Sequence, residues 1–217
     1  MIELIVKALL AYLLGSVVGS LLIGKLRGVD IRTLGSGNAG ATNMLRTQGK
    51  AAALAVFAID LGKGWVATAL LAPAVIPGVP AADIGLRAWL APVCGLAVIL
   101  GHVYPLWYGL RGGKGVATFV GAVLGINPAL LPVIILVWLL VVILSGFVGL
   151  ASIVSAGAVA AAIAASASTR TAPLLAFGAL AALLIVYTHR GNIARMCAGS
   201  EPRAQRLWLL GLRRGRS

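Results

Sequence analysis

The chain has 217 residues, of which 60% are hydrophobic and only 11% are charged. This small number of charged side chains could not cover a water-facing surface. The composition therefore indicates an integral membrane protein and excludes an ordinary soluble enzyme. The formal net charge is +13. Outside the C-terminal tail, however, no basic patch is interleaved with aromatic side chains, which argues against nucleic acid as a partner and favours membrane lipids.

Seven apolar runs are predicted to cross the membrane, since a transmembrane helix needs about 20 mainly apolar residues. The runs cover residues 4–23, 51–72, 89–103, 116–126, 129–145, 148–168 and 172–188. The fourth run is short for a span, but counting it as one lets the later loops obey the positive-inside rule. The first run has no convincing cleavage site after a small residue, so it is expected to be a retained helix.

The loop over residues 25–50 sets the predicted orientation. It carries five Lys or Arg side chains against the single carboxylate of Asp30. By the positive-inside rule this loop is cytoplasmic, which places the N-terminus outside and, after seven spans, the C-terminus in the cytoplasm. The predicted fold class is therefore an all-α integral membrane protein with seven transmembrane helices.

Residues 34–46, Leu-Gly-Ser-Gly-Asn-Ala-Gly-Ala-Thr-Asn-Met-Leu-Arg, are the one long polar, glycine-rich interruption of the apolar pattern. Glycines allow sharp turns that present backbone N–H groups, and the polar side chains add donors. Donors and a cation without a carboxylate indicate an anion site, with phosphate as the favoured ligand; a merely flexible loop is the alternative. The candidate residues are Ser36, Gly37, Asn38, Gly40, Thr42, Asn43 and Arg46.

The second run places Asp60 and Lys63 three residues apart, on one helical face. Charges at membrane depth usually face a protein interior or a water-filled cavity. The two side chains could form an ion pair that only locks helices together. We favour a mixed role, in which Lys63 reaches towards the anion site and Asp60 holds it there.

The third run ends near His102 and an aromatic belt, and a second glycine-rich basic turn follows at residues 111–118. The turn reads Arg-Gly-Gly-Lys-Gly-Val-Ala-Thr, which lacks the spacing of a P-loop but would likewise present N–H groups and a lysine before a helix. A histidine at such an interface is as often a structural hydrogen-bonding group as a ligand. The candidate residues are His102, Gly112, Gly113, Lys114, Gly115 and Thr118.

A third polar segment, residues 188–203, follows the last span at the inner membrane surface. Its candidate residues are His189, Asn192, Arg195 and Glu201. Residues 1–203 are expected to form one membrane domain. Residues 204–217 are expected to form a basic cytoplasmic tail that lies on anionic lipid. The tail carries Arg206, Arg213, Arg214 and Arg216.

The sequence also argues against several chemistries. The two cysteines, Cys94 and Cys197, have no disulfide or metal spacing, and the histidines have no carboxylate partners at ligand spacing, so no metal is expected. No carboxylate pair suits a glycosidase, no Gly-x-Ser-x-Gly elbow suits a serine hydrolase, and the His-x-x-x-x-Asp motif of many membrane acyltransferases is missing. An organic-phosphate or anion transporter is the alternative, but it should show repeated halves and polar residues near the midplane. A non-catalytic scaffold would leave the polar loops unexplained.

The three polar blocks, at 35–46, 102–118 and 189–201, resemble in order the signature blocks of the bacterial acyl-phosphate:glycerol-3-phosphate acyltransferases, the PlsY family. The resemblance implies an enzyme of the bacterial inner membrane with seven spans. Such an enzyme transfers a fatty acyl group from acyl phosphate to the 1-position of glycerol 3-phosphate and gives lysophosphatidic acid and phosphate. The resemblance also implies that neither coenzyme A nor acyl carrier protein is the direct donor, and that no metal or other cofactor is required.

Carried over by position, the resemblance implies that the essential polar residues are Ser36, Arg46, Lys114, His189 and Asn192. Lys63 lies in the family's Asp-x-x-Lys-Gly stretch. Where the family has a serine at the start of the sixth span this chain has Gly149, and Ser152 matches the next serine. A direct role for the first serine is therefore not carried over.

Acyl phosphate is already activated, so we expect no covalent enzyme intermediate. In this hypothesis Lys114 with its glycine-rich turn, together with Arg46, neutralises the departing phosphate. Asn192 and Arg195 position glycerol 3-phosphate, and the serine of the first block hydrogen-bonds a reacting oxygen. The hydroxyl proton passes either to His189 or to a substrate phosphate oxygen. The protein is expected to function as a monomer.

Overall fold

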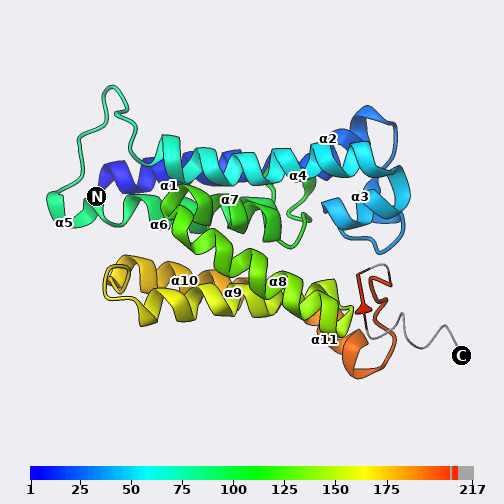
Figure 1. Cartoon of the computed structure of the whole chain (residues 1–217). Helices are drawn as coiled ribbons and strands as arrows, with labels where there is room; N and C mark the ends of the chain where they lie inside the picture. Colours follow the sequence, from blue (N-terminus) through cyan, green and yellow to red (C-terminus); the bar gives the residue numbers. More distant parts are fainter. Residues whose placement is uncertain (206, 210–217) are drawn as a thin grey trace, which may run out of the picture. The chain divides into compact units, whose positions relative to one another are not determined.

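The computed structural model describes residues 1–205 and 207–209, and every regular element in that part of the chain is a helix (Figure 1). The chain divides into two compact units, Met1–Pro128 and Ala129–Ser217. Each unit has its own packed helices. The expectation of one membrane domain over residues 1–203 is untested and stays a prediction.

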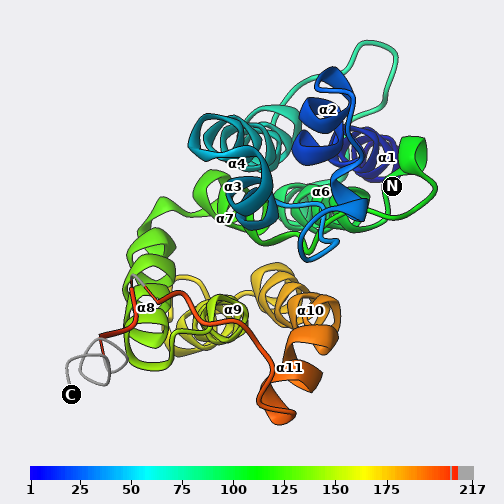
Figure 2. The ribbon, with the colours of Figure 1, turned by 90° about the vertical axis from the view of Figure 1, so that its right-hand side faces the viewer.

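The first unit is a bundle of apolar helices that lie side by side (Figures 1 and 2). Its four main helices are α1 (Ile2–Gly15), α4 (Lys50–Trp65), α6 (Leu90–Val103) and α7 (Val116–Ile126). Helix α1 packs along α6, and α4 packs along α7. These pairs approach closely because glycines lie at the contacts: a β-carbon on Gly101 would overlap the carbonyl oxygen of Tyr12, and one on Gly121 would overlap that of Leu61.

The first predicted span is broken, so the expectation of one continuous helix over residues 4–23 is wrong. Helix α1 ends at Gly15, and α2 (Gly19–Leu26) continues at a bend of 40°. The carbonyl groups of Gly15 and Val17, at the break, accept hydrogen bonds from Lys63 Nζ at 2.9 Å and 2.8 Å. A buried ammonium thus replaces helical hydrogen bonds that the break removes.

The polar stretch at 34–46 is only partly a loop. A short 3₁₀ turn, η1 (Ile31–Thr33), precedes it, and helix α3 (Ala41–Gln48) starts at Ala41. Gly40 precedes α3 in an extended conformation. Both α2 and α3 pack on α4. The sequence therefore located the polar segment correctly, but the part after Gly40 is helical.

The remaining elements of the first unit are short. The π-helical segment η2 (Val66–Leu71) extends α4, so the two together cover the second predicted span. Helix α5 (Ile84–Arg87) lies before α6, and the 3₁₀ turn η3 (Leu106–Tyr108) lies between α6 and the second glycine-rich turn.

The second unit consists of helices joined by tight turns. They are η4 (Pro128–Leu130) at its start, α8 (Leu131–Ser145), α9 (Val148–Ala165), α10 (Ala172–Thr188) and α11 (Arg190–Cys197). The expected turn between α8 and α9 is confirmed, and Gly146 permits it with φ of 77°. Helix α9 ends at Ala165 rather than at residue 168, because Ser166 is extended and Thr169 Oγ1 donates back to the carbonyl of Ile163.

The all-helical membrane class is confirmed. Among the described residues, four helices are long and apolar enough to cross a membrane, and six segments qualify if each of two bent helix pairs is one span. Helix α7 is a further, shorter apolar helix. The bent pairs are α1 with α2, at 40°, and α10 with α11, at 55°. The count of seven spans and the orientation of the termini stay predictions.

The start of the C-terminal tail folds back onto the turn between α8 and α9. The guanidinium of Arg203 lies over the rings of Phe147 and Trp208, at 4.5 Å and 4.0 Å. Trp208 Nε1 donates to the carbonyl of Leu144 at 3.2 Å. The rest of the segment that was expected to lie on lipid, Arg206 and residues 210–217 with Arg213, Arg214 and Arg216, lies outside the described residues.

Candidate active site

The first glycine-rich loop is braced from within by Asn43. This side chain is 1% exposed, and its Oδ1 accepts from the Ser36 backbone N–H at 3.0 Å. Its Nδ2 donates to the carbonyls of Ile31 and Leu34 at 3.1 Å and 2.9 Å. Asn43, a predicted ligand, is therefore committed to the shape of the loop.

The other polar groups of this loop face outwards. Ser36, Thr42 and Arg46 are exposed, and Thr42 and Arg46 are four residues apart on one face of α3. Among the described residues, the Arg46 guanidinium has no hydrogen-bond or ion-pair partner. The N-terminus of α3 opens beside Gly40 and presents backbone N–H groups that favour an anion, while Arg46 lies in the last turn of the same short helix.

Two further predicted residues, Gly37 and Asn38, lie where the backbone of this loop turns. Gly37 has φ of 70°, a left-handed conformation that favours glycine. The Asn38 side chain lies over Gly40, where an added β-carbon would come within 2.8 Å of Asn38 Nδ2. The glycines of the sequence pattern thus allow the tight path of the backbone here.

The second glycine-rich turn lies directly against the first loop. Gly112 and Gly113 donate backbone hydrogen bonds to the carbonyls of Val103 and His102 at 3.0 Å and 3.2 Å. A β-carbon on Gly113 would overlap both the Ala39 carbonyl oxygen and the His102 ring. The structure therefore brings the first two sequence blocks together, as the phosphate-site prediction requires.

Helix α7 begins straight after this turn, at Gly115 with φ of 83°. Lys114 is half-buried immediately before it. Thr118, in the first turn of α7, is fully buried, and its Oγ1 has no partner within the described residues. An N-terminal helix turn with a lysine and a buried hydroxyl resembles the anion cradle that the glycines and the lysine of this turn predicted.

Arg32 is a residue of this region that the sequence analysis missed. Its Nη1 donates to the carbonyls of Tyr108 and Arg111, at 3.0 Å and 3.4 Å, and so ties the first loop to the second turn. Asp30 holds the guanidinium with three contacts, Nε to Oδ1 at 3.0 Å, Nε to Oδ2 at 3.2 Å and Nη2 to Oδ2 at 2.8 Å. The one feature of the sequence that could have indicated this role is the carboxylate of Asp30, two residues before the arginine.

The Asp30–Arg32 pair predicts a small pH dependence of stability. The Arg32 guanidinium, hydrogen-bonded to Asp30, holds the pKa of that carboxyl below its ordinary value. The stabilisation is therefore present above the unfolded pKa, which is about 4, and is lost as the pH falls through the folded pKa. The pair is partly exposed, so Asp30→Asn is expected to cost less than about 1 kcal/mol at neutral pH. Thermal unfolding of both proteins from pH 7 to pH 3 should show this difference vanish with acid; a constant difference would contradict it.

Asp60, Lys63 and His102 form a buried cluster beneath these loops. Lys63 Nζ lies 3.0 Å from Asp60 Oδ1 and 2.9 Å from His102 Nδ1. Asp60 Oδ1 also accepts from the Gly19 N–H at 3.0 Å, at the start of α2. Lys63 was expected to reach into the anion site, but its ammonium is directed to these groups and to the broken helix instead.

The third block lies in the second unit, where α10 meets α11. His189 is 3% exposed, and its Nδ1 lies 2.8 Å from the carbonyl of Ile185. A carbonyl can only accept, so Nδ1 carries a proton in this contact. Asn192, 8% exposed, is one turn of chain away on α11.

Glu201 organises this block as an acceptor. Its carboxylate takes a hydrogen bond from Asn192 Nδ2 at 2.5 Å and one from Arg195 Nε at 2.7 Å. The residue was predicted to belong to the substrate site. Its contacts fix the two side chains that were expected to position glycerol 3-phosphate. Gly149 completes the packing, since a β-carbon there would come within 3.1 Å of three Asn192 side-chain atoms.

We predict that Glu201→Ala lowers activity by about tenfold or more. It would leave a buried amide and a cation without their shared acceptor, at a cost of about 1–3 kcal/mol. Turnover and thermal midpoints of the purified variant check this. Ser200→Ala, which removes an exposed hydroxyl next to Glu201, is the matched control; equal rates in both variants would contradict the prediction.

Comparison with known proteins identifies a family that this chain resembles over most of its length. Residues 5–199 match the family pattern described as glycerol-3-phosphate acyltransferase. The chain is 39% identical over 195 residues to a glycerol-3-phosphate acyltransferase of Synechococcus sp. (strain CC9902), covering 89% of this chain and 92% of the relative. It is 39% identical over 193 residues to that of Aquifex aeolicus (strain VF5), covering 89% and 95%.

Solved structures agree as well. The chain is similar to the crystal structure of PlsY (YgiH), an integral membrane glycerol 3-phosphate acyltransferase, in its glycerol 3-phosphate form, with a TM-score of 0.82, 36% identity and coverage of 92% of this chain and 94% of that one. The lysophosphatidic acid form gives a TM-score of 0.78 at 35% identity, with the same coverage. The family match, the identities and the shared fold all point the same way: this chain belongs to the glycerol-3-phosphate acyltransferase family.

Proposed function

We propose that the chain transfers a fatty acyl group from acyl phosphate to the 1-position of glycerol 3-phosphate and releases lysophosphatidic acid and phosphate. The observation that carries the proposal is the contact between two glycine-rich, cation-bearing segments at Gly113 and Ala39. Both segments lead into helix N-termini, and both substrates carry phosphate. The named relatives act on the same acceptor.

In the proposed reaction the 1-hydroxyl oxygen of glycerol 3-phosphate attacks the acyl carbonyl carbon. A carbon–oxygen bond forms there, and the bond between that carbon and the phosphate oxygen breaks. Lys114 and Arg46 stabilise the negative charge on the leaving phosphate, and the N–H groups of the glycine turn act with them. Ser36 donates a hydrogen bond to a reacting oxygen.

The remaining residues hold the acceptor and its proton. Asn192 and Arg195, oriented by Glu201, position glycerol 3-phosphate. The hydroxyl proton goes to His189 Nε2 or to a substrate phosphate oxygen, with proximity supplying much of the rate. His189→Asn distinguishes the two: near-normal turnover would assign the proton to the substrate, whereas a loss of about 10²-fold or more would assign it to the imidazole.

The proposed topology has seven spans, with the N-terminus outside and the C-terminus in the cytoplasm of a bacterial inner membrane. Four straight helices, two bent pairs and the short helix α7 supply seven apolar segments in the described part of the chain. The cations of the loop at 25–50 then face the cytoplasm. The protein acts as a monomer among membrane lipids, with the reaction at the cytoplasmic face.

The test is acyl transfer by purified protein from palmitoyl phosphate to labelled glycerol 3-phosphate, with palmitoyl-CoA in parallel and EDTA present. Product from acyl phosphate alone supports donor, reaction and metal independence together. Product only from the thioester would overturn the donor assignment. No product from either, with folded protein, would favour the organic-phosphate or anion transporter, which uptake of labelled glycerol 3-phosphate into liposomes would then reveal.

A further inference from the structure

The buried cluster of the first unit is electrically balanced. Asp60, Lys63 and His102 are 1%, 5% and 3% exposed. Asp60 Oδ1 lies 3.0 Å from Lys63 Nζ and 3.3 Å from His102 Nδ1. One carboxylate and one ammonium at this distance compensate each other, so with a neutral imidazole the cluster has no excess charge to attract a phosphate.

The donors of Lys63 are also fully used. An ammonium group has three N–H bonds. Two of them are directed to the carbonyls of Gly15 and Val17, at 2.9 Å and 2.8 Å, and the third to the Asp60–His102 side of the cluster. No donor is left for a substrate oxygen, so Lys63 serves the protein rather than the ligand.

His102 connects the cluster to the second glycine-rich turn. The Nδ1 edge of its ring faces Lys63 and Asp60. The opposite edge, Nε2, faces Gly113, since a β-carbon on Gly113 would overlap it. The backbone carbonyl of His102 accepts from the Gly113 N–H at 3.2 Å. The turn before Lys114 thus packs on the His102 ring, and the contacts of Nδ1 with Lys63 and Asp60 fix the orientation of that ring.

Resting on the proposed reaction, we propose that Asp60, Lys63 and His102 are a positioning cluster: without contacting substrate, they hold the turn at 112–115 against the first loop. Rotation of the His102 ring would withdraw the surface on which Gly113 lies. A displacement of reacting groups by about 1 Å can cost about 10²-fold in rate, so a cluster outside the site can control turnover.

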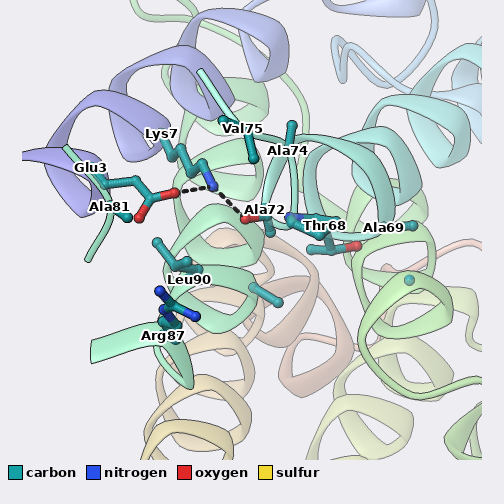
Figure 3. A pocket seen from close by; sticks show the side chains of 13 residues that line it. Glu3, Lys7, Thr68, Ala69, Ala72, Ala74, Val75, Ala81, Arg87 and Leu90 are labelled. Carbon is teal, nitrogen blue, oxygen red and sulfur yellow. Dashed lines mark hydrogen bonds and ion pairs between the residues drawn. The ribbon is translucent and has the colours of Figure 1, made fainter. Parts of the chain in front are cut away.

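A matched control pair exists at the other end of the same helices. Lys7 is 1% exposed, and its Nζ lies 2.6 Å from Glu3 Oε1 and 2.6 Å from the carbonyl of Ala72 (Figure 3). Like Lys63, it is a buried lysine that pairs with an acid and with a main-chain carbonyl. It lines a cavity with Leu90, at the start of α6, which lies twelve residues, about 18 Å of helix, from His102.

The experiment is a double-mutant cycle with Lys63→Gln, Asp60→Asn and the double variant, measured as kcat and KM for each substrate on folded protein. Each single change leaves one buried charge uncompensated, so each should lower kcat by about tenfold or more. The double variant should recover at least about tenfold over Lys63→Gln, because neutrality is restored. A phosphate-binding Lys63 would instead raise KM equally in the single and double variants, which would overturn the proposal.

Hydrogen exchange of the loops gives a readout that does not depend on turnover. Amides of residues 105–118 and 35–48 should exchange about tenfold faster in Lys63→Gln and return towards wild type in the double variant. Lys7→Gln with Glu3→Gln should leave these amides unchanged even if the thermal midpoint falls. Unchanged exchange in folded Lys63→Gln would overturn positioning. If wild-type protein transfers no acyl group, the reaction fails while the exchange pattern still decides this proposal.

His102 variants keep the test decisive if Lys63→Gln does not fold. Asparagine places an amide where Nδ1 lies, so His102→Asn should retain hydrogen bonding to the cluster and exceed His102→Ala in kcat by about threefold or more. Equal kcat in the two folded variants would overturn the role of the ring. A folded Asp60→Asn/Lys63→Gln double variant whose kcat lies below that of both single variants would also overturn the positioning cluster.

Discussion

Replacement of Lys114 by alanine is expected to lower kcat for acyl transfer by about 10²–10³-fold, which would be the largest effect of a single charge in the chain. The residue is half-buried and lies between Gly113 and the start of α7, where the N-terminal backbone N–H groups of a helix favour an anion. In the proposed reaction its positive charge stabilises the negative charge that develops on the leaving phosphate. Removal takes away an interaction that strengthens towards the transition state, so kcat should fall more than KM rises.

Lys114→Arg is the companion variant. Arginine keeps the charge but replaces a compact ammonium with a planar fork, so partial activity is expected, between those of the wild-type and alanine proteins. Steady-state kinetics with both substrates, on protein whose thermal midpoint is unchanged, provide the check. An alanine variant within threefold of wild type would remove Lys114 from the catalytic group.

Gly113→Ala is expected to abolish most activity and to destabilise the protein by about 1–3 kcal/mol. The added β-carbon would overlap the Ala39 carbonyl oxygen on one side and the His102 ring on the other. One of these neighbours is backbone, so it cannot swing aside as a flexible side chain could. The two glycine-rich segments must then separate, which misplaces Lys114 relative to the first loop and should cost about 10²-fold in kcat.

Gly62→Ala is the matched control for this prediction. Gly62 lies in α4, next to Lys63, and an added β-carbon would meet no atom within 4 Å. Alanine in a helix interior is favoured over glycine by about 0.5–1 kcal/mol, so this variant should be as active as wild type and slightly more stable. Comparable loss in both alanine variants would show that the close contact at Gly113 does not set the geometry.

The sequence alone determined the class of the protein and the outline of its site. Apolar runs are local signals of composition and length, so the helices at 116–126 and 172–188 have the bounds that were predicted. The three polar blocks could be recognised because clustered donors and cations with few carboxylates are also a local signal. Their residue types indicated phosphate before any contact was known.

What the sequence could not determine were contacts between residues far apart in the chain. At the break between α1 and α2 the Val17 carbonyl accepts from Lys63 Nζ, 46 residues away in the chain. The residues of the run at 4–23 do not by themselves predict this break. The fixed amide of Asn192 depends on Glu201 beyond the end of α11.

The position of the second turn likewise depends on a glycine that lies between Ala39 and His102. The number and type of polar residues follow from the sequence of each segment alone, so they could be predicted. Which carbonyl, ring or carboxylate satisfies each polar group is a matter of packing. Lys63 was expected near the anion site, and only the tertiary structure shows its ammonium directed to Asp60, His102 and the carbonyls at the helix break.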